Sequence, residues 1–351
     1  VNLAEAIFDL GGVAINYMPV VSLIKEGDLI AGAVIRDGES GSEYQIKAQA
    51  VINATGVFSD GVRKMDEPDA ASIIAASQGS HLVLPKAFLP GNSAVMVPNT
   101  PDGRVLFAVP WHDHVVVGTT DLGVDNITVE PVPMEEEIGF ILTNAAKYLS
   151  KNPSRSDILS VYAGLRPLVK AGDGSSTAAL SRDHTILISN SGLLTIAGGK
   201  WTTYRKMAQD AVDQAETMAG LEERPCRTEH FQIHGWTRQA IPEPSLGVYG
   251  ADAPAIREIA IEEPALAEKF HPELPYIGAE VVWAVRSEMA RTVEDVLARR
   301  TRALLLGARA SIEAAPRVAE LMARELKRDG DWQKQTVKEF TQVAKGYLPP
   351  A

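Results

Sequence analysis

The chain has 351 residues, of which 45% are hydrophobic and 23% are charged. This length and balance are those of a folded protein with room for two domains, and they exclude disordered and fibrous classes. The net charge of −11 argues against nucleic-acid binding and against a polybasic membrane anchor, but it permits a local basic pocket for a small anion.

The single cysteine, Cys226, permits no internal disulfide and no cysteine-based metal site, which indicates a cytoplasmic protein. No apolar run approaches the ~18 residues that span a bilayer, and the first residues lack a signal-peptide pattern. Any membrane contact is therefore expected to be peripheral. The sequence begins at Val1 and has a Gly11-Gly12 turn signal soon afterwards, so we expect it to start in the middle of a domain.

The first 120 residues are rich in short predicted strands. Apolar patterns predict strands at residues 14–18, 20–24, 29–35 and 44–49. The apolar run 50–56 is typical of a buried parallel strand that ends near a ligand. Turn signals separate further predicted strands at 80–84, 94–97, 105–111 and 114–118. Their close spacing predicts an antiparallel sheet.

Helices dominate the later part of the chain. One amphipathic helix is predicted at 134–150, and another at 202–219 follows strands at 158–165, 185–189 and 193–197. Beyond residue 245, apolar stripes predict helices at 281–306 and 312–326, the second with Pro316 near its start. We expect an α/β protein of the α+β type, with one domain at 1–240, an antiparallel sheet at about 75–190 within it, and an all-α domain at 245–351.

A candidate anion site lies where a predicted strand ends in Gly198-Gly199 and Lys200 precedes the helix at 202–219. The start of a helix presents unpaired N–H groups and a partial positive charge, which attract phosphate, carboxylate or an electron-rich ring. The alternative is an ordinary strand-to-helix turn capped by Thr202.

Glycine and polar residues also meet at four predicted strand ends, namely 53–56, 79–81, 118–121 and 164–167. Glycine lets the backbone approach a ligand closely, and the neighbouring side chains supply specific contacts. Together with Arg182 and Lys200, these segments predict a pocket for an anionic small molecule. His81 fits either a general base or a structural hydrogen-bonder, whereas His112 and His114 are more typical of a hairpin turn than of a metal site.

These segments occur in the order found in FAD-dependent glycerol-3-phosphate dehydrogenases, which the chain resembles over essentially its whole length. The resemblance is carried by 51–56 (VINATG), 79–81 (GSH), 117–121 (VGTTD), 164–168 (GLRPL), 181–183 (SRD) and 198–205 (GGKWTTYR). The helical tail, with 282–286 (VWAVR) and 294–300 (EDVLARR), is similar to that family's C-terminal domain. The family opens with a Gly-x-Gly-x-x-Gly turn that no segment here matches, so the chain resembles the family without its N-terminal lobe.

The resemblance implies a partial FAD-binding Rossmann-like lobe, an antiparallel substrate-binding sheet and a helical C-terminal domain. It implies oxidation of sn-glycerol 3-phosphate to dihydroxyacetone phosphate, with hydride transfer to FAD and onward transfer to quinone or oxygen. Catalytic roles fall to His81, Arg166 and Lys200, and substrate contacts to Arg166, Arg182, Thr119 and Thr120. The implied FAD contacts are Ala54, Thr55, Gly56, Gly199, Lys200, Trp201 and Thr202. No metal is implied, and FAD binding by this chain alone is a separate question from the parent activity.

Two other functions stay open from the sequence. One is a related flavin amine oxidase of the glycine or sarcosine oxidase type, in which a carboxylate would replace the phosphate. The other is a non-enzymatic interaction module on a degenerate oxidase domain. A homodimer and a peripheral contact with the inner face of the cytoplasmic membrane are also open.

Overall fold

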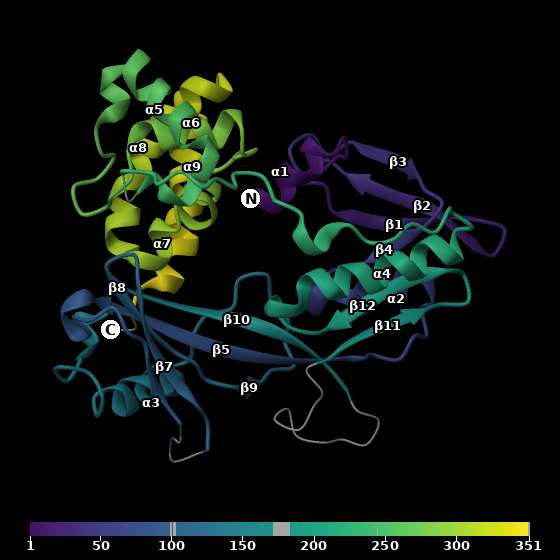
Figure 1. Ribbon diagram of the computed structural model, residues 1–351, viewed down its shortest axis with the longest axis horizontal. Coiled ribbons are helices and arrows are strands. Elements are labelled where there is room, and N and C mark those ends of the chain that lie inside the picture. Colours follow the sequence, from purple (N-terminus) through teal and green to yellow (C-terminus); the bar gives the residue numbers. More distant parts are fainter. Residues whose placement is uncertain (99, 101–102, 171–182, 244, 350–351) are drawn as a thin grey trace.

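The computed structural model describes residues 1–98, 100, 103–170, 183–243 and 245–349, which form three sheets and a helical bundle (Figure 1). The chain opens with helix α1 (Asn2–Asp9), where the sequence predicted no element. Residues 14–18 are irregular, so the strand predicted there is wrong. The α/β class with a helical C-terminal part is confirmed.

An antiparallel sheet follows α1. Its strands are β1 (Val20–Glu26), β2 (Leu29–Arg36) and β3 (Glu43–Lys47), in the order β1-β2-β3. Gly27 has a φ of +63° in the turn between β1 and β2, a conformation that glycine adopts without the Cβ penalty of other residues. The loop between β2 and β3 of this sheet contacts the helical bundle.

A second sheet contains the predicted parallel strand. β4 (Val51–Asn53) runs parallel to β12 (Leu193–Gly198), and β11 (His184–Ile188) pairs antiparallel with β12. Helix α2 (Ser59–Asp66) follows β4, and α4 (Tyr204–Met218) follows β12. α4 buries Ala211 and Ala215 against Leu194 and Ile196, as the amphipathic pattern predicts.

The largest sheet is antiparallel and is built on two long strands, β5 (Ile74–Pro85) and β10 (Ser160–Val169). Its order is β10-β5-β8-β7-β6, with β9 also paired to β5. The shorter strands are β6 (Val95–Val97), β7 (Leu106–Trp111), β8 (His114–Gly118) and β9 (Leu122–Gly123). Helix α3 (Glu135–Ala145) covers one face, where Ile138 and Ile141 pack against Leu82 and Val117.

The helical bundle forms the largest apolar core and docks on β10. Its helices are α5 (Ala253–Glu262), α6 (Gly278–Arg286), α7 (Ala303–Leu306), α8 (Ala308–Leu326) and α9 (Gly330–Ala344). The Ser160 hydroxyl donates to the Leu304 carbonyl at 3.0 Å, and the Ala308 N–H donates to the Leu159 carbonyl at 3.1 Å. Among the described helices, none is both long and apolar enough to cross a membrane.

Two helix predictions in the bundle are wrong in detail. The helix predicted at 281–306 is divided into α6, a π-helical turn η9 (Asp295–Arg300) and α7. Met289 and Arg302 have φ values of +55° and +60°, which a continuous right-handed helix excludes. Pro316 lies in the interior of α8 rather than near its start.

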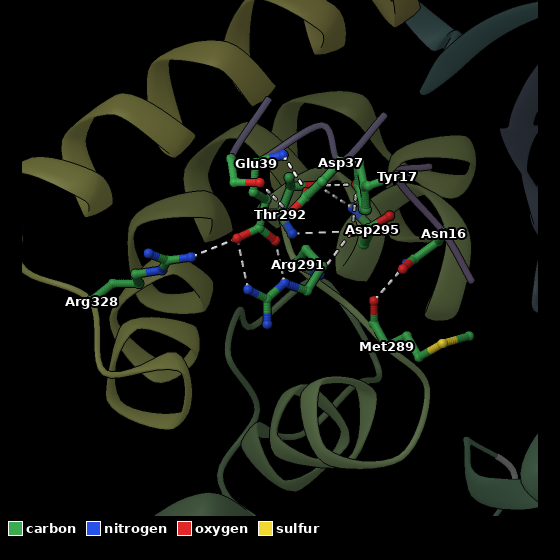
Figure 2. Close-up of polar contacts among 10 residues, drawn as sticks. Asn16, Tyr17, Asp37, Glu39, Met289, Arg291, Thr292, Asp295 and Arg328 are labelled. Carbon is green, nitrogen blue, oxygen red and sulfur yellow. Dashed lines mark hydrogen bonds and ion pairs between the residues drawn. The ribbon is translucent and has the colours of Figure 1, made fainter. Parts of the chain in front are cut away.

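Polar contacts join the irregular segment before β1 and the β2–β3 loop to the bundle (Figure 2). The Tyr17 hydroxyl donates to Asp295 Oδ2 at 2.6 Å, and Asn16 Nδ2 donates to the Met289 carbonyl at 2.8 Å. The Glu39 carboxylate accepts from Arg291 Nε at 2.5 Å and Nη2 at 2.8 Å. A further bond reaches Glu39 from a second arginine, Arg328, at 2.7 Å. We call this set of contacts the β-to-bundle clamp.

Candidate active site

The candidate site is built on one face of the β5–β10 pair. Arg166 is opposite Ser77, Gly164 is opposite Gly79, and Tyr162 is opposite His81. Side chains two residues apart on a strand share a face, so all six positions lie on one side of the sheet. Of the two paired glycines, Gly79 is covered by the Arg166 guanidinium, whereas Gly164 leaves open space beside it.

The Arg166 guanidinium lies over Gly79. A Cβ at Gly79 would stand 2.3 Å from Arg166 Nη2, so any larger residue would displace the arginine. Nη2 donates to Thr119 Oγ1 at 3.1 Å and to the Thr120 carbonyl at 3.0 Å. Asp121 adds a carboxylate oxygen 3.7 Å from Nη1. Arg166 is therefore held in one place while about a third of its side chain stays exposed.

His81 is fixed in a similar way, by Gly118 on β8. A Cβ at Gly118 would stand 2.3 Å from His81 Cδ2. On its other side the imidazole stacks on Tyr162, with 5.2 Å between ring centroids and 14° between planes. Burial, and then the positive charge of Arg166, lower the pKa of His81 to about 4. The imidazole is thus neutral at pH 7 and has a nitrogen lone pair that can accept a proton.

The loop after β8 places its two threonines differently. Thr119 is half-buried beside Arg166, where its hydroxyl accepts the Nη2 hydrogen bond. Thr120 is almost fully buried, and its hydroxyl accepts from the Ser80 N–H at 2.9 Å and donates to Glu137 of α3. The Thr119 side chain therefore contacts Arg166, whereas the Thr120 side chain lies on the opposite side of β5, against Glu137.

The segments assigned to FAD by the resemblance lie where β4 and β12 end. Asn53 is buried and accepts from the Thr55 hydroxyl at 2.7 Å, which shapes the turn at Ala54 and Thr55. Ala54 and Thr55 are exposed, and Gly56 has a φ of +60°. This turn therefore presents backbone and a short side chain at the open end of a parallel strand, where ligands of such sheets bind.

The turn after β12 is equally open. Gly198 and Gly199 both have a φ of +76°, and a Cβ at Gly199 would stand 2.3 Å from Met207 Sδ. Lys200 and Thr202 are exposed, and Trp201 keeps 78% of its surface. The Thr203 hydroxyl accepts from the Lys200 N–H at 3.3 Å and donates to the Lys200 carbonyl at 3.0 Å, and α4 begins after Thr203 without a side-chain cap bond, so the predicted Thr202 cap is wrong.

The two parts of the candidate site adjoin. β10 packs against β12 and against η1 (Gly56–Phe58). A Cβ at Gly198 would stand 3.2 Å from Cγ2 of Val169, the last residue of β10 and three positions beyond Arg166. The fold thus brings the end of β10 close to Gly198, although the Val169 side chain lies on the face of the sheet opposite to Arg166. Arg182, predicted as the second arginine of the pocket, lies outside the described residues.

Sequence reasoning missed several polar residues around the site. Ser77 and Tyr162 share the face of His81, and the alternation along β5 and β10 could have identified them. Gln78 and Glu137 lie behind β5, and no local pattern links these two positions. The turn predicted at His112 is confirmed, since His112 and Asp113 have positive φ values in the β7–β8 hairpin. Within the described ranges, no cluster of three or more acidic, histidine or cysteine residues could hold a metal ion.

Comparison with known proteins places the chain among flavoenzymes. Residues 1–205 match the family described as FAD dependent oxidoreductase, and residues 192–335 match the C-terminal domain of alpha-glycerophosphate oxidase. The mitochondrial glycerol-3-phosphate dehydrogenase of Homo sapiens is 39% identical over 96% of this chain and 50% of its own length. For the Arabidopsis thaliana relative, glycerol-3-phosphate dehydrogenase SDP6, the identity is 37% over 96% of this chain and 58% of that protein. The chain thus spans about half the length of the relatives it matches.

A solved structure extends the likeness to three dimensions. The glycerol-3-phosphate dehydrogenase of Bacillus halodurans, determined in complex with FAD, superposes with a TM-score of 0.83 at 29% identity. The match covers 98% of this chain and 71% of that chain. The likeness therefore includes the β5–β10 sheet, the open ends of β4 and β12, and the helical bundle.

Proposed function

Because the chain belongs to the FAD-dependent oxidoreductases, in the glycerol-3-phosphate dehydrogenase family, we propose that it oxidises sn-glycerol 3-phosphate to dihydroxyacetone phosphate. One observation carries this proposal. Arg166 is held over Gly79, on the same face of the sheet as a neutral His81, with only glycine between them. A cation and a proton acceptor on one face of the sheet suit a substrate with a phosphate at one end and an alcohol at the other.

FAD is the cofactor of this family, and the residues present fit part of its binding site. The exposed turn 54–56 and the turn 198–202 offer backbone N–H groups, glycines with positive φ and short side chains. We assign FAD contacts to Ala54, Thr55, Gly56, Gly199, Lys200, Trp201 and Thr202. When bound, FAD accepts the hydride from the substrate carbon. The positive charges of Lys200 and of the helix start would stabilise negative charge on a reduced ring.

The phosphate is assigned to Arg166. A guanidinium binds phosphate with two parallel hydrogen bonds, which fix orientation as well as position. Thr119 lies beside it and supplies a hydroxyl, and we assign Arg182 as a second cation. Thr120 contributes its carbonyl, which helps to hold Arg166, rather than a direct contact of its hydroxyl.

The proton of the substrate alcohol is assigned to His81. A neutral imidazole accepts that proton from the hydroxyl oxygen as a hydride leaves the carbon that bears the hydroxyl, so that the alcohol becomes a ketone. A phosphate at Arg166 would offset the positive charge that lowers the pKa of His81, and a bound substrate would thereby make His81 a stronger base.

The electrons pass on to quinone or oxygen in this proposal. We place the protein in the cytoplasm, with a peripheral contact at the membrane when quinone is the acceptor.

The test uses the FAD-loaded protein under anaerobic conditions. Adding glycerol 3-phosphate is expected to bleach the visible absorption of the oxidised flavin, whereas glycerol at the same concentration is not. Arg166→Ala is expected to lower kcat/KM for glycerol 3-phosphate roughly 30-fold, since loss of a charged hydrogen bond costs ~2 kcal/mol. Arg155→Ala is the matched control, because Arg155 is partly exposed and pairs with Glu135 on the surface.

Two results would contradict the proposal. If the FAD-loaded protein keeps its flavin absorption in the presence of glycerol 3-phosphate, it does not catalyse the proposed reaction. Equal kcat/KM values for the Arg166→Ala and Arg155→Ala proteins would show that Arg166 does not bind the phosphate.

A further inference from the structure

A second polar network lies behind the candidate site, on the opposite face of β5. Its centre is Glu137 of α3, a carboxylate with only 4% of its surface exposed. It accepts hydrogen bonds from Gln78 Nε2 at 2.8 Å, from the Met134 N–H at 2.8 Å and from the Thr120 hydroxyl. All three donors are neutral groups, so the network concentrates a negative charge on the side of the sheet away from the substrate.

Thr120 connects this network to the site. Its hydroxyl also accepts from the Ser80 N–H at 2.9 Å, next to His81 in the chain, and its carbonyl accepts from Arg166 Nη2 at 3.0 Å. β8 ends at Gly118, so the Thr120 hydroxyl takes the place of a ladder partner for β5 at Ser80. One residue thus contacts both strands that carry the candidate site.

The charge of Glu137 fixes the direction of these bonds. A carboxylate only accepts, so the Thr120 hydroxyl has to donate to it, and the Thr120 oxygen is left to accept from Ser80. A hydrogen bond to an ionised acceptor is roughly twice as strong as one between neutral groups. Thr120 is therefore held in a single orientation, with its carbonyl directed at Arg166.

We propose that Glu137 is a positioning residue for the phosphate site, acting on Arg166 through Thr120. This inference rests on the proposed function. A guanidinium gains its two parallel bonds to phosphate only when it is correctly oriented, and a displacement of about 1 Å is enough to cost a large part of such a site's effect. Glu137 touches neither substrate nor flavin, so its removal acts on substrate affinity before it acts on the chemical step.

The experiment compares four single variants of the FAD-loaded protein and the Glu137→Gln/Thr120→Val double variant. Glu137→Gln removes the charge and turns an amide toward groups that all donate. Thr120→Val keeps the shape but removes the hydroxyl, and Thr120→Ser restores it. Glu136→Gln is the matched control, because Glu136 lies on the same turn of α3 but is exposed.

The readouts are KM and kcat for glycerol 3-phosphate and the inhibition constant of inorganic phosphate. Glu137→Gln and Thr120→Val are each expected to raise KM and the phosphate inhibition constant about tenfold, a change of ~1.4 kcal/mol, while kcat per folded molecule stays within about threefold. Thr120→Ser and Glu136→Gln are expected to keep wild-type values. In the double variant, KM and the phosphate inhibition constant are expected to be no higher than in the more impaired of the two single variants, because both changes break the same connection.

Other outcomes overturn the inference. If Glu137 had a purely structural role, Glu137→Gln would lower the fraction of folded protein, and so the maximal rate, without changing KM or the phosphate inhibition constant. Additive effects in the double variant would show that Glu137 does not act through Thr120. If Glu137→Gln does not fold, Thr120→Val decides alone, and a wild-type KM in that variant refutes the connection. Turnover by the wild-type protein separates these results from failure of the proposed function, which would abolish the reaction in every variant.

Discussion

Two glycines govern how the reactive side chains of the candidate site lie. Gly79 leaves space for the Arg166 guanidinium and Gly118 leaves space for the His81 ring, each at a point where a Cβ would stand 2.3 Å from the side chain. Real Cβ atoms do not come so close to other heavy atoms, so a side chain at either position requires the neighbour to move. The absence of a methyl group is thus as specific a feature of the site as the arginine itself.

Gly79→Ala tests this at the scale of one residue. The added methyl group displaces the flexible end of Arg166 rather than the backbone, so we expect KM for glycerol 3-phosphate to rise about tenfold or more while the protein still folds. Steady-state kinetics and a thermal unfolding curve measure the two effects. Gly139→Ala, which adds a methyl group in open space on α3, is the control. A Gly79→Ala protein with wild-type KM would show that the observed position of Arg166 is not required for substrate binding.

The sequence predicted part of this arrangement and not the rest. His81, Thr119 and Arg166 stand in short glycine-containing motifs, and the fold brings them to one face. Thr120 belongs to the same motif, yet its hydroxyl turns to the other face because β8 ends two residues earlier. Glu137 is 17 positions further along the chain, and only the packing of α3 on the sheet reveals its contact. Long-range contacts of this kind leave no local periodicity.

At the scale of elements, helix α6 contains a carboxyl group in an apolar core. Glu280 is fully buried, and it accepts from the Ile277 N–H at 2.8 Å and from the Tyr249 hydroxyl at 3.1 Å. Burial raises the pKa of Glu280 to about 8, so the folded protein holds this group protonated at pH 7. An unfolded chain ionises it near pH 4.5, which makes folding take up a proton between these two values.

Glu280→Gln should therefore change how stability depends on pH. Between about pH 4.5 and pH 8 the native state binds more protons at this group than the unfolded state, so its contribution to stability falls as pH rises. Glutamine takes up no proton in this range, so we expect the stability of the variant relative to wild type to rise by ~3 kcal/mol between pH 5 and pH 8. Urea unfolding at both pH values measures the difference. Glu262→Gln controls for the lost charge, and parallel pH curves of the Glu280→Gln and wild-type proteins would show that Glu280 is not held protonated.

Element boundaries show where local patterns fail. The apolar stripe at 281–306 predicts one helix, but positive φ at Met289 and Arg302 turns the chain twice to fill a core with α6 and α7. The opposite error occurs at Pro316, which lacks an N–H for the helix and yet lies inside α8. Its neighbours Ala314, Ala315 and Val318 are fully or almost fully buried, and this packing outweighs the lost hydrogen bond.

At the scale of the whole molecule, the β-to-bundle clamp joins segments that are more than 250 residues apart in the chain. The Asp295 carboxylate is nearly buried and is bonded by both Tyr17 and Arg300. Glu39, in contrast, is partly exposed between its two arginines, and exposed ion pairs contribute little. The Tyr17 bond to a buried charge is therefore the contact in the clamp that matters most for stability.

Tyr17→Phe removes that bond and keeps the ring. We expect a loss of about 1–2 kcal/mol in the free energy of unfolding, because a buried carboxylate loses a hydrogen bond. Tyr44→Phe is the matched control, since Tyr44 is an exposed tyrosine on β3, in the sheet that follows Tyr17. Urea unfolding curves followed by far-UV circular dichroism give both values. The same free energy for the two variants would mean that Tyr17 does not hold the bundle in place.

The opposite faces of β5 restrict how this protein can vary in length. Ser77, Gly79 and His81 lie on the face of the sheet that carries Arg166, while Gln78 turns to the carboxylate on α3. Inserting or deleting one amino acid before Ser77 would exchange these two sets, placing glutamine on the pocket side and the imidazole against the helix. Insertions, deletions and junctions between related sequences therefore belong in the loops that flank β5, and a library made by recombining homologues should keep the strand intact from Ile74 to Pro85.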